Sequence, residues 1–467
     1  MSTIAIDVDP YKTKPETEPL RELEADKNLR MLVLGDFSGQ ATGKLIRVDR
    51  DNFDHVLGNF APRVEVGFGN GQFGDTELVF HSLVDFEPDS LYLKSEVFAP
   101  LRDHSGQTLY AEPEEEGHAA TLKPTPEQMA RLTSPGGLLD AILEKGSVSA
   151  NGGAAVSPKR VDDLESMVQR IVAPYATPAE SEGSKRAAAE RTKTLNLLMT
   201  HILHDESFQT LEAAWRGLDM LVHGLDTDAL IHLYILDISK ERLTADLKST
   251  ADVRDSEVYE ALPGRWGLIA ANLSFDREVV ADVEALERLS TLAQALGAPL
   301  IAEWLTSREE SPKAEAAWQA LRQTAAAQYV ALALPRFLLR LPYGKDTAPV
   351  DGFEFEEMKG EGAHREYLWG NPAFACALAL GRLYEHQNAL APVPAYLRLN
   401  DLPMHIFEAA GTKQARPCTE VLLSDNDCQA LLEEGVLPVA AVKGTDSIVF
   451  PRMRSIAQGA GHWAGLE

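Results

Sequence analysis

The sequence predicts a chain of α/β and α+β class, in which a small α+β module packs on a larger α/β module with a mixed, largely parallel sheet. Two patterns support this prediction. Beyond residue 191, apolar strands alternate with amphipathic helices, which is typical of parallel strands joined by crossover helices. Between residues 29 and 110 the apolar runs are shorter, and two of them flank a glycine-rich turn as in a hairpin. The length of 467 residues allows about two to four domains, each with its own core.

Residues 1–28 are predicted to form an N-terminal arm strand followed by a linker. Ile4, Ile6 and Val8 alternate with smaller or polar residues, as in a short strand. A polar stretch rich in Lys, Glu and Pro separates this strand from the rest of the chain, so it cannot close a sheet locally. Two arrangements remain open: the strand folds back onto its own domain, or it adds to the sheet edge of another chain.

Residues 29–110 are predicted to form the small module. A buried-type strand at 32–34 ends in a turn rich in Gly, Asp and Ser, which tolerate unusual dihedral angles. The elements expected after it are a strand around Ile46 and Val48, a helix beginning near residue 51, a hairpin of 63–66 and 77–80, and a helix opened by Pro88.

Residues 111–135 are predicted to be a linker because they are rich in Glu and Pro. Residues 136–190 are predicted to be a helical connector. Its first helix has Ser134 as a plausible N-cap and Gly146 just beyond its C-terminus. One face of this helix is apolar and consists of Leu138, Leu139, Ile142 and Leu143.

Residues 191–467 are predicted to form the larger module. Apolar runs indicate strands at 231–238, 266–271, 299–303 and 329–334, and the last of these is expected to be central and buried. The helices expected between them lie at 240–248, 281–296 and 314–327.

Charge and cysteine usage limit the functional classes. The chain has 44 Lys and Arg against 71 Asp and Glu, a net charge of −27, which argues against a nucleic-acid surface or an anionic-membrane patch. Cys376, Cys418 and Cys428 form no CxxC pair, which favours a reducing cytosol over a disulfide framework. No secretory signal is visible, and the most apolar run, 329–341, is too short to span a bilayer. We therefore expect a cytoplasmic protein that binds no nucleic acid and does not insert into a membrane.

Two glycine-rich segments match nucleotide-binding motifs only in part. Residues 69–74 (GNGQFG) fit GxGxxG, but the residues that follow alternate like a strand, whereas the dinucleotide fingerprint leads into a helix. A hairpin turn is the favoured interpretation. Residues 39–45 have three residues where a phosphate-binding loop needs four, and Leu45 stands where Ser or Thr would contact magnesium. We therefore expect a flexible loop and no nucleotide.

Neither candidate metal set has the spacing of a site. His201 and His204 stand three residues apart beside Asp205 and Glu206, without a third spaced ligand. The favoured interpretation is a helix end at which Asp205 caps the next helix. Residues 424–427 (SDND) precede an apolar helix and resemble a capping box.

An acidic segment follows the strand at 329–334. Its carboxylates could form an acid/base or cation site, but they lack the glycine turn and the ligand spacing of a calcium loop. A solvated loop is the favoured interpretation. The acidic residues are Asp351, Glu354, Glu356, Glu357 and Glu361. Because no nucleophile–base pair stands out, the sequence predicts no catalytic, cofactor-binding or metal-binding residue.

Several longer segments resemble a known family. The segments 34–39 (LGDFSG), 48–53 (VDRDNF) and 83–91 (LVDFEPDSL) resemble the small sheath subunit of type VI secretion systems. Four later segments resemble the large sheath subunit of the same machine: 211–218 (LEAAWRGL), 332–344 (LALPRFLLRLPYG), 367–371 (YLWGN) and 443–446 (KGTD). The resemblance implies a sheath-protomer-like fold with both subunits fused in one chain.

The resemblance also implies a function and partners. The family pair forms a heterodimer that polymerises around an inner tube and contracts to propel it, so self-association and contacts with other sheath subunits, the inner tube and the baseplate are expected. Ile4, Ile6 and Val8 match the arm that adds to a neighbour's sheet. The helix carrying Leu138 and Leu143 resembles the element recognised by the recycling AAA+ unfoldase.

One departure from the family keeps alternatives open. The resemblance implies a large-subunit part that is C-terminally truncated, since the family continues well beyond the segment 443–446 and the sequence given ends at Glu467. The first hypothesis is a fused sheath subunit that polymerises. The second is a non-polymerising, sheath-like accessory that caps, nucleates or regulates the sheath or baseplate. A third is an α/β enzyme that uses the acidic segment.

Overall fold

The computed structural model describes residues 28–68, 75–102, 182–306, 311–358, 360, 362–459 and 463–466. By its contacts the chain divides into one compact unit of Met1–Leu101 with Arg191–Glu467 and a second of Arg102–Glu190. The predicted arm strand, the 69–74 turn, the 111–135 linker and the first connector helix lie outside the described residues.

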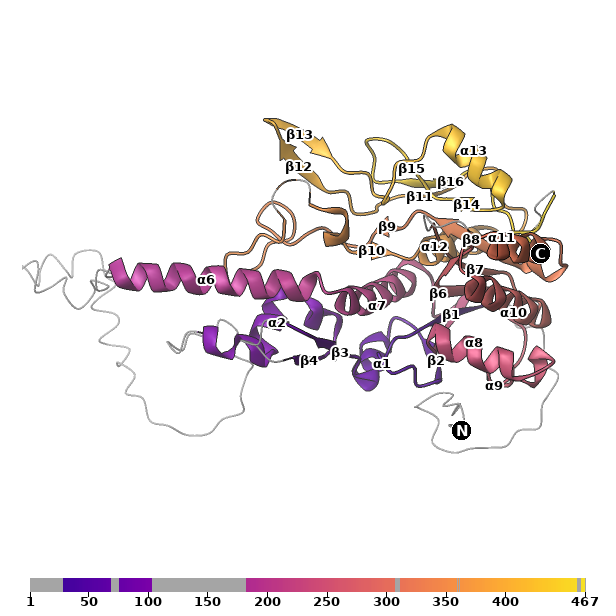
Figure 1. Cartoon of the computed structure of the whole chain (residues 1–467), viewed down its shortest axis with the longest axis horizontal. Coiled ribbons are helices and arrows are strands. Elements are labelled where there is room, and N and C mark those ends of the chain that lie inside the picture. Colours follow the sequence, from indigo (N-terminus) through magenta and orange to yellow (C-terminus); the bar gives the residue numbers. More distant parts are fainter. Residues whose placement is uncertain are drawn as a thin grey trace, which may run out of the picture. The chain divides into compact units, whose positions relative to one another are not determined.

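A seven-stranded sheet forms the centre of the first unit (Figure 1). Every neighbouring pair of strands is parallel except the pair formed by β2 and β5. The expectation of a mixed, largely parallel sheet is therefore confirmed. In spatial order the strands are β14 (Leu437–Pro438), β8 (Val330–Leu334), β7 (Leu300–Leu305), β6 (Leu268–Asp276), β1 (Leu29–Gly35), β5 (Ile231–Asp237) and β2 (Leu45–Val48).

The small region contributes a strand to the interior of this sheet, in addition to packing on the larger region. In β1, Val33 stands opposite Ile235 of β5 on one side and Ala270 of β6 on the other. The strand at 329–334, expected to be central, lies one place from the sheet edge instead. The strand is buried, as expected, but its predicted central position was wrong, because among the described residues only the two-residue strand β14 pairs on its far side and local sequence patterns do not report strand order.

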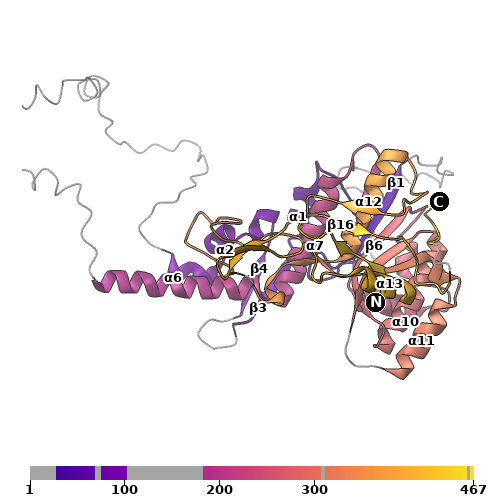
Figure 2. The ribbon, with the colours of Figure 1, turned by 90° about the horizontal axis from the view of Figure 1, so that it is seen from above.

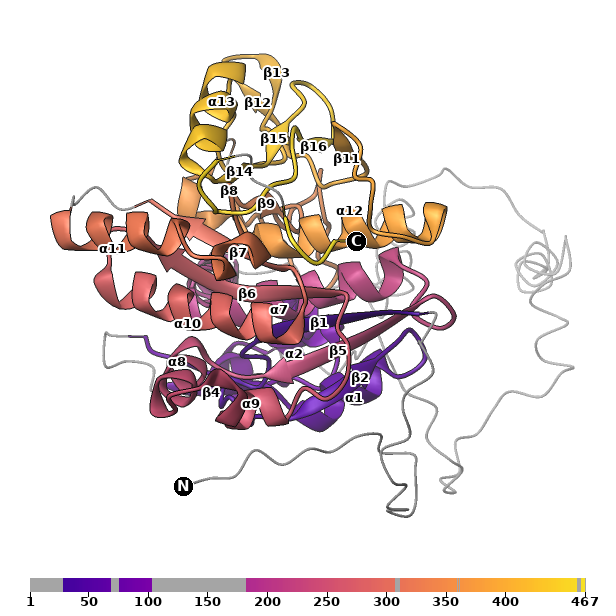
Figure 3. The ribbon, with the colours of Figure 1, turned by 90° about the vertical axis from the view of Figure 1, so that its right-hand side faces the viewer.

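Helices cover both faces of the sheet, as Figures 2 and 3 show. On one face lie α7 (Glu206–Gly224) and α12 (Pro372–Gln387), and on the other α8 (Lys240–Ser249), α10 (Val280–Leu296) and α11 (Pro312–Arg322). The alternation of β1 fits this layering. Met31 and Val33 belong to the core that contains α7 and α12, while Leu32 and Leu34 belong to the opposite core. A strand buried on both faces must be apolar throughout, as β1 nearly is.

The remaining elements of the small region share the core of α7. They are α1 (Phe53–Phe60), the hairpin of β3 (Arg63–Val66) and β4 (Thr76–Val79), α2 (Pro88–Lys94), and the 3₁₀ helices Leu83–Phe86 and Glu96–Leu101. Phe80 stacks on Phe86 with ring centroids 4.0 Å apart, and both rings meet Phe208 of α7 edge-on. These apolar side chains form one continuous core with α7 and with the residues of α6 (Glu182–Leu203) from Leu195 onward.

The C-terminal part adds small sheets and one helix beside the main sheet. These are β9 (Phe337–Leu338) with β10 (Trp369–Gly370), β11 (Leu397–Leu399) with β16 (Ile448–Phe450) and β15 (Ala440–Ala441), the hairpin of β12 (Ile406–Ala409) and β13 (Thr412–Ala415), and α13 (Asp425–Glu434). The other short helices are α9 (Glu257–Glu260) and the 3₁₀ helices Val253–Asp255, Ala326–Tyr329 and His364–Glu366. Within the described residues, no helix combines the length and apolarity needed to cross a membrane.

Most predicted elements begin and end within three residues of the observed ones. The helix predicted at 314–327 is the clearest exception, because α11 ends at Arg322 and a separate 3₁₀ helix begins at Ala326. Thr324 lies at the break, where its hydroxyl accepts a hydrogen bond from the amide of Ala327. Such a side-chain bond competes with the continuing helix.

Candidate functional site

The junction between the small and large regions is the candidate functional site. It has a sheet part, in which β1 lies between β5 and β6, and three sets of side-chain contacts. The first two sets each join a segment of residues 29–102 to a segment beyond residue 205, and the third lies within the large region.

The first set surrounds Asp237, a buried carboxylate at the end of β5. Its two oxygens accept hydrogen bonds from the amides of Phe37, Ser38 and Thr42 and from the hydroxyls of Ser38 and Thr42, at 2.5–3.1 Å. These five bonds satisfy the acceptor capacity of the buried carboxylate. Asp237 therefore holds the chain that leaves β1 against the neighbouring strand.

The 39–45 loop, expected to be flexible, is held within this junction. Besides the bonds of Thr42 to Asp237, the Arg242 guanidinium donates a 2.6 Å hydrogen bond to the carbonyl of Ala41. Gly39 has a φ of +72°, and a Cβ there would lie 2.3 Å from the carbonyl oxygen of Arg63. Glycine is required because the backbone is left-handed and closely approached.

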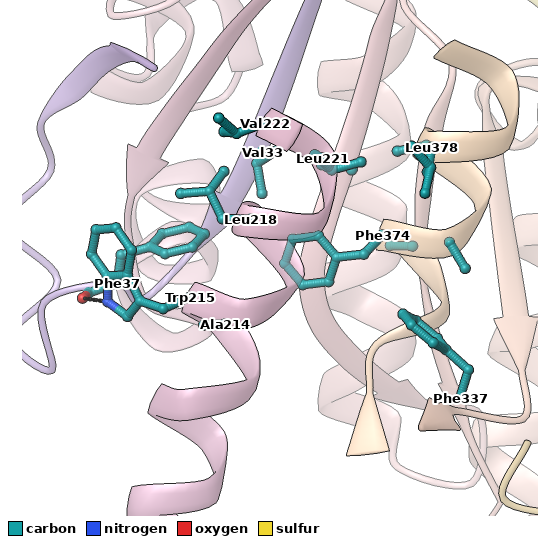
Figure 4. Packing of buried hydrophobic residues seen from close by; sticks show 14 of the residues in the cluster. Val33, Phe37, Ala214, Trp215, Leu218, Leu221, Val222, Phe337, Phe374 and Leu378 are labelled. Atoms are coloured by element: carbon teal, nitrogen blue, oxygen red, sulfur yellow. Dashed lines mark hydrogen bonds between the residues drawn. The ribbon is translucent and has the colours of Figure 1, made fainter. Parts of the chain in front are cut away.

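The second set centres on Trp215 of α7 (Figure 4). Its indole Nε1 donates a 2.8 Å hydrogen bond to the carbonyl of Phe37, and the two rings meet edge-on at 5.5 Å. Phe53 and Phe60 of α1 contact the same indole edge-on, each at 5.9 Å. Trp215 is fully buried, so this one side chain joins β1 and α1 to α7.

Arg50 extends the same junction at the C-terminus of α7. Its guanidinium donates hydrogen bonds to the carbonyls of Val222, His223 and Leu225 at 2.8–3.3 Å. The last carbonyls of a helix lack intrahelical partners and carry partial negative charge. A cation from the small region therefore caps a helix of the large region.

The third set is a cluster of buried charges within the large region. Arg340 donates to Glu212 from Nε at 2.9 Å and to Glu357 from Nη1 at 2.8 Å. Arg216 donates to Glu212 at 2.7 Å and to the hydroxyl of Tyr343 at 3.0 Å. The two carboxylates and two guanidinium groups balance in charge, and we call these five residues the ion cluster.

Burial and opposite charges set the pKa values in the ion cluster. Burial alone would raise the pKa of Glu357, but the charge of Arg340, the adjacent His204 imidazole and the amide of Tyr343 outweigh it and lower the pKa to about 2. Burial would likewise lower the pKa of Arg340, and Glu212 and Glu357 instead hold that pKa well above its usual value. Both groups are therefore ionised at neutral pH.

The acidic segment touches the small region through backbone groups and one side chain. Asp89 of α2 accepts hydrogen bonds from the amides of Asp351 and Gly352, at 3.0 and 2.7 Å. The ring of Tyr92 lies 5.1 Å from that of Phe353. These contacts place the segment beside α2.

The favoured interpretation of this segment as a solvated loop is wrong for Glu357. Glu354 and Glu356 are exposed, whereas Glu357 is 5% exposed and pairs with Arg340. Glu361 lies outside the described residues. Local sequence could not separate Glu357 from its neighbours, because its burial depends on Arg340 and on Glu212, which is remote in sequence.

The other local predictions agree with the structure. Asp205 caps α7 by accepting bonds from the amides of Ser207 and Phe208, while His201 Nε2 lies 2.9 Å from the carbonyl oxygen of Gly67. Ser424 and Asp427 form the predicted capping box of α13. The three cysteines are buried and unbridged.

The polar and charged side chains described above form hydrogen bonds and ion pairs with other protein groups. No group of three or more His, Cys, Asp or Glu side chains in the described part of the chain could hold a metal ion. Burial raises the pKa of Cys418 to about 11, so its thiol stays protonated at neutral pH. The contacts at the junction can therefore hold the small and large regions together as one rigid unit.

Sequence reasoning missed the functional role of the junction residues, although many lie in the segments that carry the family resemblance. These are Phe37, Ser38, Arg50, Asp89, Glu212, Trp215, Arg216, Arg340 and Tyr343. Asp237 lies outside those segments. Its signal was an acidic residue at the end of an apolar strand, which alone does not indicate its five donors.

We expect Glu357→Gln to lower the free energy of unfolding by about 3–5 kcal/mol, because it leaves Arg340 buried with an incomplete set of counter-charges. Glu354→Gln is the matched control, with an expected change within about 0.5 kcal/mol, since Glu354 is exposed. Urea unfolding followed by tryptophan fluorescence measures both. Equal effects of the two variants would contradict the assignment.

Stability should also depend on pH through Glu357. Its folded pKa of about 2 lies below the ordinary glutamate value of 4.5, so its contribution is complete above pH 4.5 and is lost as the pH falls toward 2. The difference in unfolding free energy between the native chain and Glu357→Gln should therefore shrink between pH 5 and pH 3, by on the order of 1–2 kcal/mol. Urea titrations across this range measure it, and a difference that stays constant or grows would contradict the depressed pKa.

Comparisons with known proteins identify both regions. Residues 185–457, more than half of the chain, match the family VipB, described as EvpB/VC_A0108, tail sheath N-terminal domain. Residues 15–102 match the family described as Type VI secretion system, VipA, VC_A0107 or Hcp2. The type VI secretion system sheath protein TssC1 of Pseudomonas aeruginosa is 32% identical over 306 residues, which cover 58% of this chain and 60% of that protein. The chain thus spans less than two thirds of that relative.

These matches confirm both halves of the resemblance. The VipA match contains β1 and the rest of the small region, and the VipB match contains the helices and strands on which that region packs. The chain belongs to the VipB tail sheath family of type VI secretion systems and carries a VipA-like region in the same polypeptide.

Proposed function

We propose that this chain is a structural component of a type VI secretion contractile sheath, a fused sheath-like protomer that assembles around an inner tube and contracts to propel it. It acts in the cytoplasm, by packing and strand exchange, with no catalysis and no cofactor. The observation that carries this proposal is that β1 of the VipA-like region lies inside the sheet of the VipB-like region.

A sheath must transmit force between subunits, which requires each protomer to move as one body. In this chain the two regions share a sheet and a core, and Trp215, Arg50 and Asp237 join them at three further places. Separating them would expose apolar surface and leave buried polar groups unpaired, which costs free energy at each contact.

Placing both regions in one polypeptide gives the assembly one-to-one stoichiometry. It also raises the effective concentration of one region for the other, so that the junction forms without a bimolecular encounter. Residues 111–135 and the connector 136–190 serve as the tether in this proposal, since the chain must pass from β1 and its neighbours to α7.

Two segments carry the proposed contacts with other molecules. Ile4, Ile6 and Val8 form the inter-protomer strand arm, which pairs with the sheet edge of a neighbouring copy or of another sheath subunit. Leu138, Leu139, Ile142 and Leu143 form the helix that an AAA+ unfoldase recognises when the sheath is recycled. The inner tube and the baseplate complete the set of proposed partners.

The arm supplies the test of this function. Ordering a short strand costs about 1–2 kcal/mol of backbone entropy per residue, which pairing with a neighbour offsets through backbone hydrogen bonds and buried side chains. We expect the purified chain to form tubules in negative-stain micrographs and expect deletion of residues 1–10 to abolish them. Replacing Ile4 and Ile6 with Pro should act likewise, because Pro removes ladder donors.

The matched control replaces Ile4 and Ile6 with Val, which keeps the strand and should keep the tubules. The melting temperature of the unassembled chain should be nearly the same in every variant. A native chain that forms no tubules would favour the non-polymerising accessory over the sheath protomer. A deletion that lowers the melting temperature markedly would place the arm on its own domain.

A further inference from the structure

A cavity lies at the carboxyl ends of three neighbouring parallel strands. It has a volume of about 740 Å³ and lies beside Asp276 of β6, Leu305 of β7 and Leu334 of β8. The segment from Glu420 to Leu431, which includes most of α13, forms its opposite side. Cavities of this size accommodate ligands or side chains, and this end of a parallel sheet is where α/β proteins commonly bind them.

The cavity has apolar walls and an apolar rim. Trp304, Leu334, Pro335 and Leu431 line it. At the rim, Leu305 is 40% exposed and Val421 is 53% exposed, while the adjacent Leu422 is 45% exposed. Neighbouring exposed apolar side chains beside a cavity are typical of a surface that a protein partner covers.

The charged lining is predominantly acidic. Asp276, Glu303, Glu420 and Asp427 line the cavity, with Arg336 as the one base among its lining residues. Arg336 forms a two-point ion pair with Glu420, at 3.0 and 2.8 Å, and His364 Nε2 lies 2.6 Å from the same carboxylate. Arg336 is therefore mainly committed to Glu420.

Glu303 is the most buried carboxylate of the lining. It is 6% exposed, accepts a 2.6 Å hydrogen bond from Ser274 Oγ, and forms a longer ion pair with Arg336, whose Nε lies 3.6 Å away. Burial raises its pKa and the charge of Glu420 raises it further, against the opposing effects of Ser274 and Arg336. A cation placed beside Glu303 would relieve this unfavourable environment.

We propose that this cavity binds a basic side chain, arginine or lysine, that a protein partner presents within an apolar segment. The cationic end pairs with Glu303, the aliphatic stem lies against Trp304, and the flanking apolar residues cover Leu305 and Val421. The excess of carboxylates selects the charge, and the exposed rim selects a peptide over a small free cation. This site lies outside the junction and does not depend on sheath assembly.

The probe is the fluorescent peptide Ala-Leu-Arg-Leu-Ala, blocked at both ends, compared with the same peptide carrying citrulline. Citrulline keeps the shape of arginine and removes its charge. Fluorescence anisotropy with the unassembled full-length chain measures both Kd values. We expect the arginine peptide to bind at least about tenfold more tightly. A photoreactive leucine in the probe should crosslink to residues 420–431.

Two variants test the location of binding. Glu303→Gln should reduce the affinity for the arginine peptide to that for the citrulline peptide, with Glu354→Gln as an unchanged control. Ala430→Trp should abolish binding by filling the cavity, since Ala430 lines it and is exposed. Gln429→Trp, on the same helix but not among the lining residues, should leave binding intact. Ala430→Trp keeps the test valid even if Glu303→Gln alters folding.

Three results would overturn the proposal. The first is equal affinity of the native chain for the arginine and citrulline peptides, which would mean that charge is not recognised. The second is arginine-peptide binding that survives Ala430→Trp, which would place it elsewhere. The third is no detectable binding at millimolar peptide. Each result leaves the sheath function unaffected, because tubule formation is measured separately.

Discussion

The insertion of β1 between β5 and β6 is the interaction on which the rest of the structure depends. A strand with hydrogen-bonded neighbours on both sides and helices on both faces cannot leave without disrupting both cores. The strand also positions Phe37 and Ser38, which contact Trp215 and Asp237 immediately after β1 ends. The VipA-like region is thus part of the α/β sheet through β1. Its hairpin and short helices pack in the core that contains α7, on one face of that sheet.

The ion cluster adds specificity more than stability to this arrangement. Buried ion pairs gain little net free energy, since desolvation offsets much of the attraction, but a misplaced partner leaves a buried charge unpaired. Arg340 reaches Glu212 on α7 and Glu357 on the acidic segment at once, so it tolerates only one placement of the two. That segment in turn meets Asp89 of α2. We infer that the cluster selects the correct docking of the small region.

Short-range sequence patterns predicted many of the helix and strand boundaries. The caps formed by Asp205 and Ser424, and the helix opened by Pro88, follow from rules that involve only neighbouring residues. The partners of β1 could not be predicted because they lie far away in the sequence. The burial of Glu357 could not be predicted either, because it depends on Arg340, whose other partner, Glu212, is 128 positions from it. The family resemblance indicated that the two regions associate, but the shared sheet became visible only in three dimensions.

The central claim is that the two regions form one cooperative unit through β1, and native-state hydrogen exchange tests it most directly. Amides in the interior of a cooperative unit exchange only through its global opening. We expect the amides of residues 31–34 to exchange with the same free energy of opening as those of residues 233–236, and both openings to depend on urea with the same slope. If residues 31–34 exchanged through an opening of clearly lower free energy, while residues 233–236 remained protected, the VipA-like region would be a separate unit and the claim would fail.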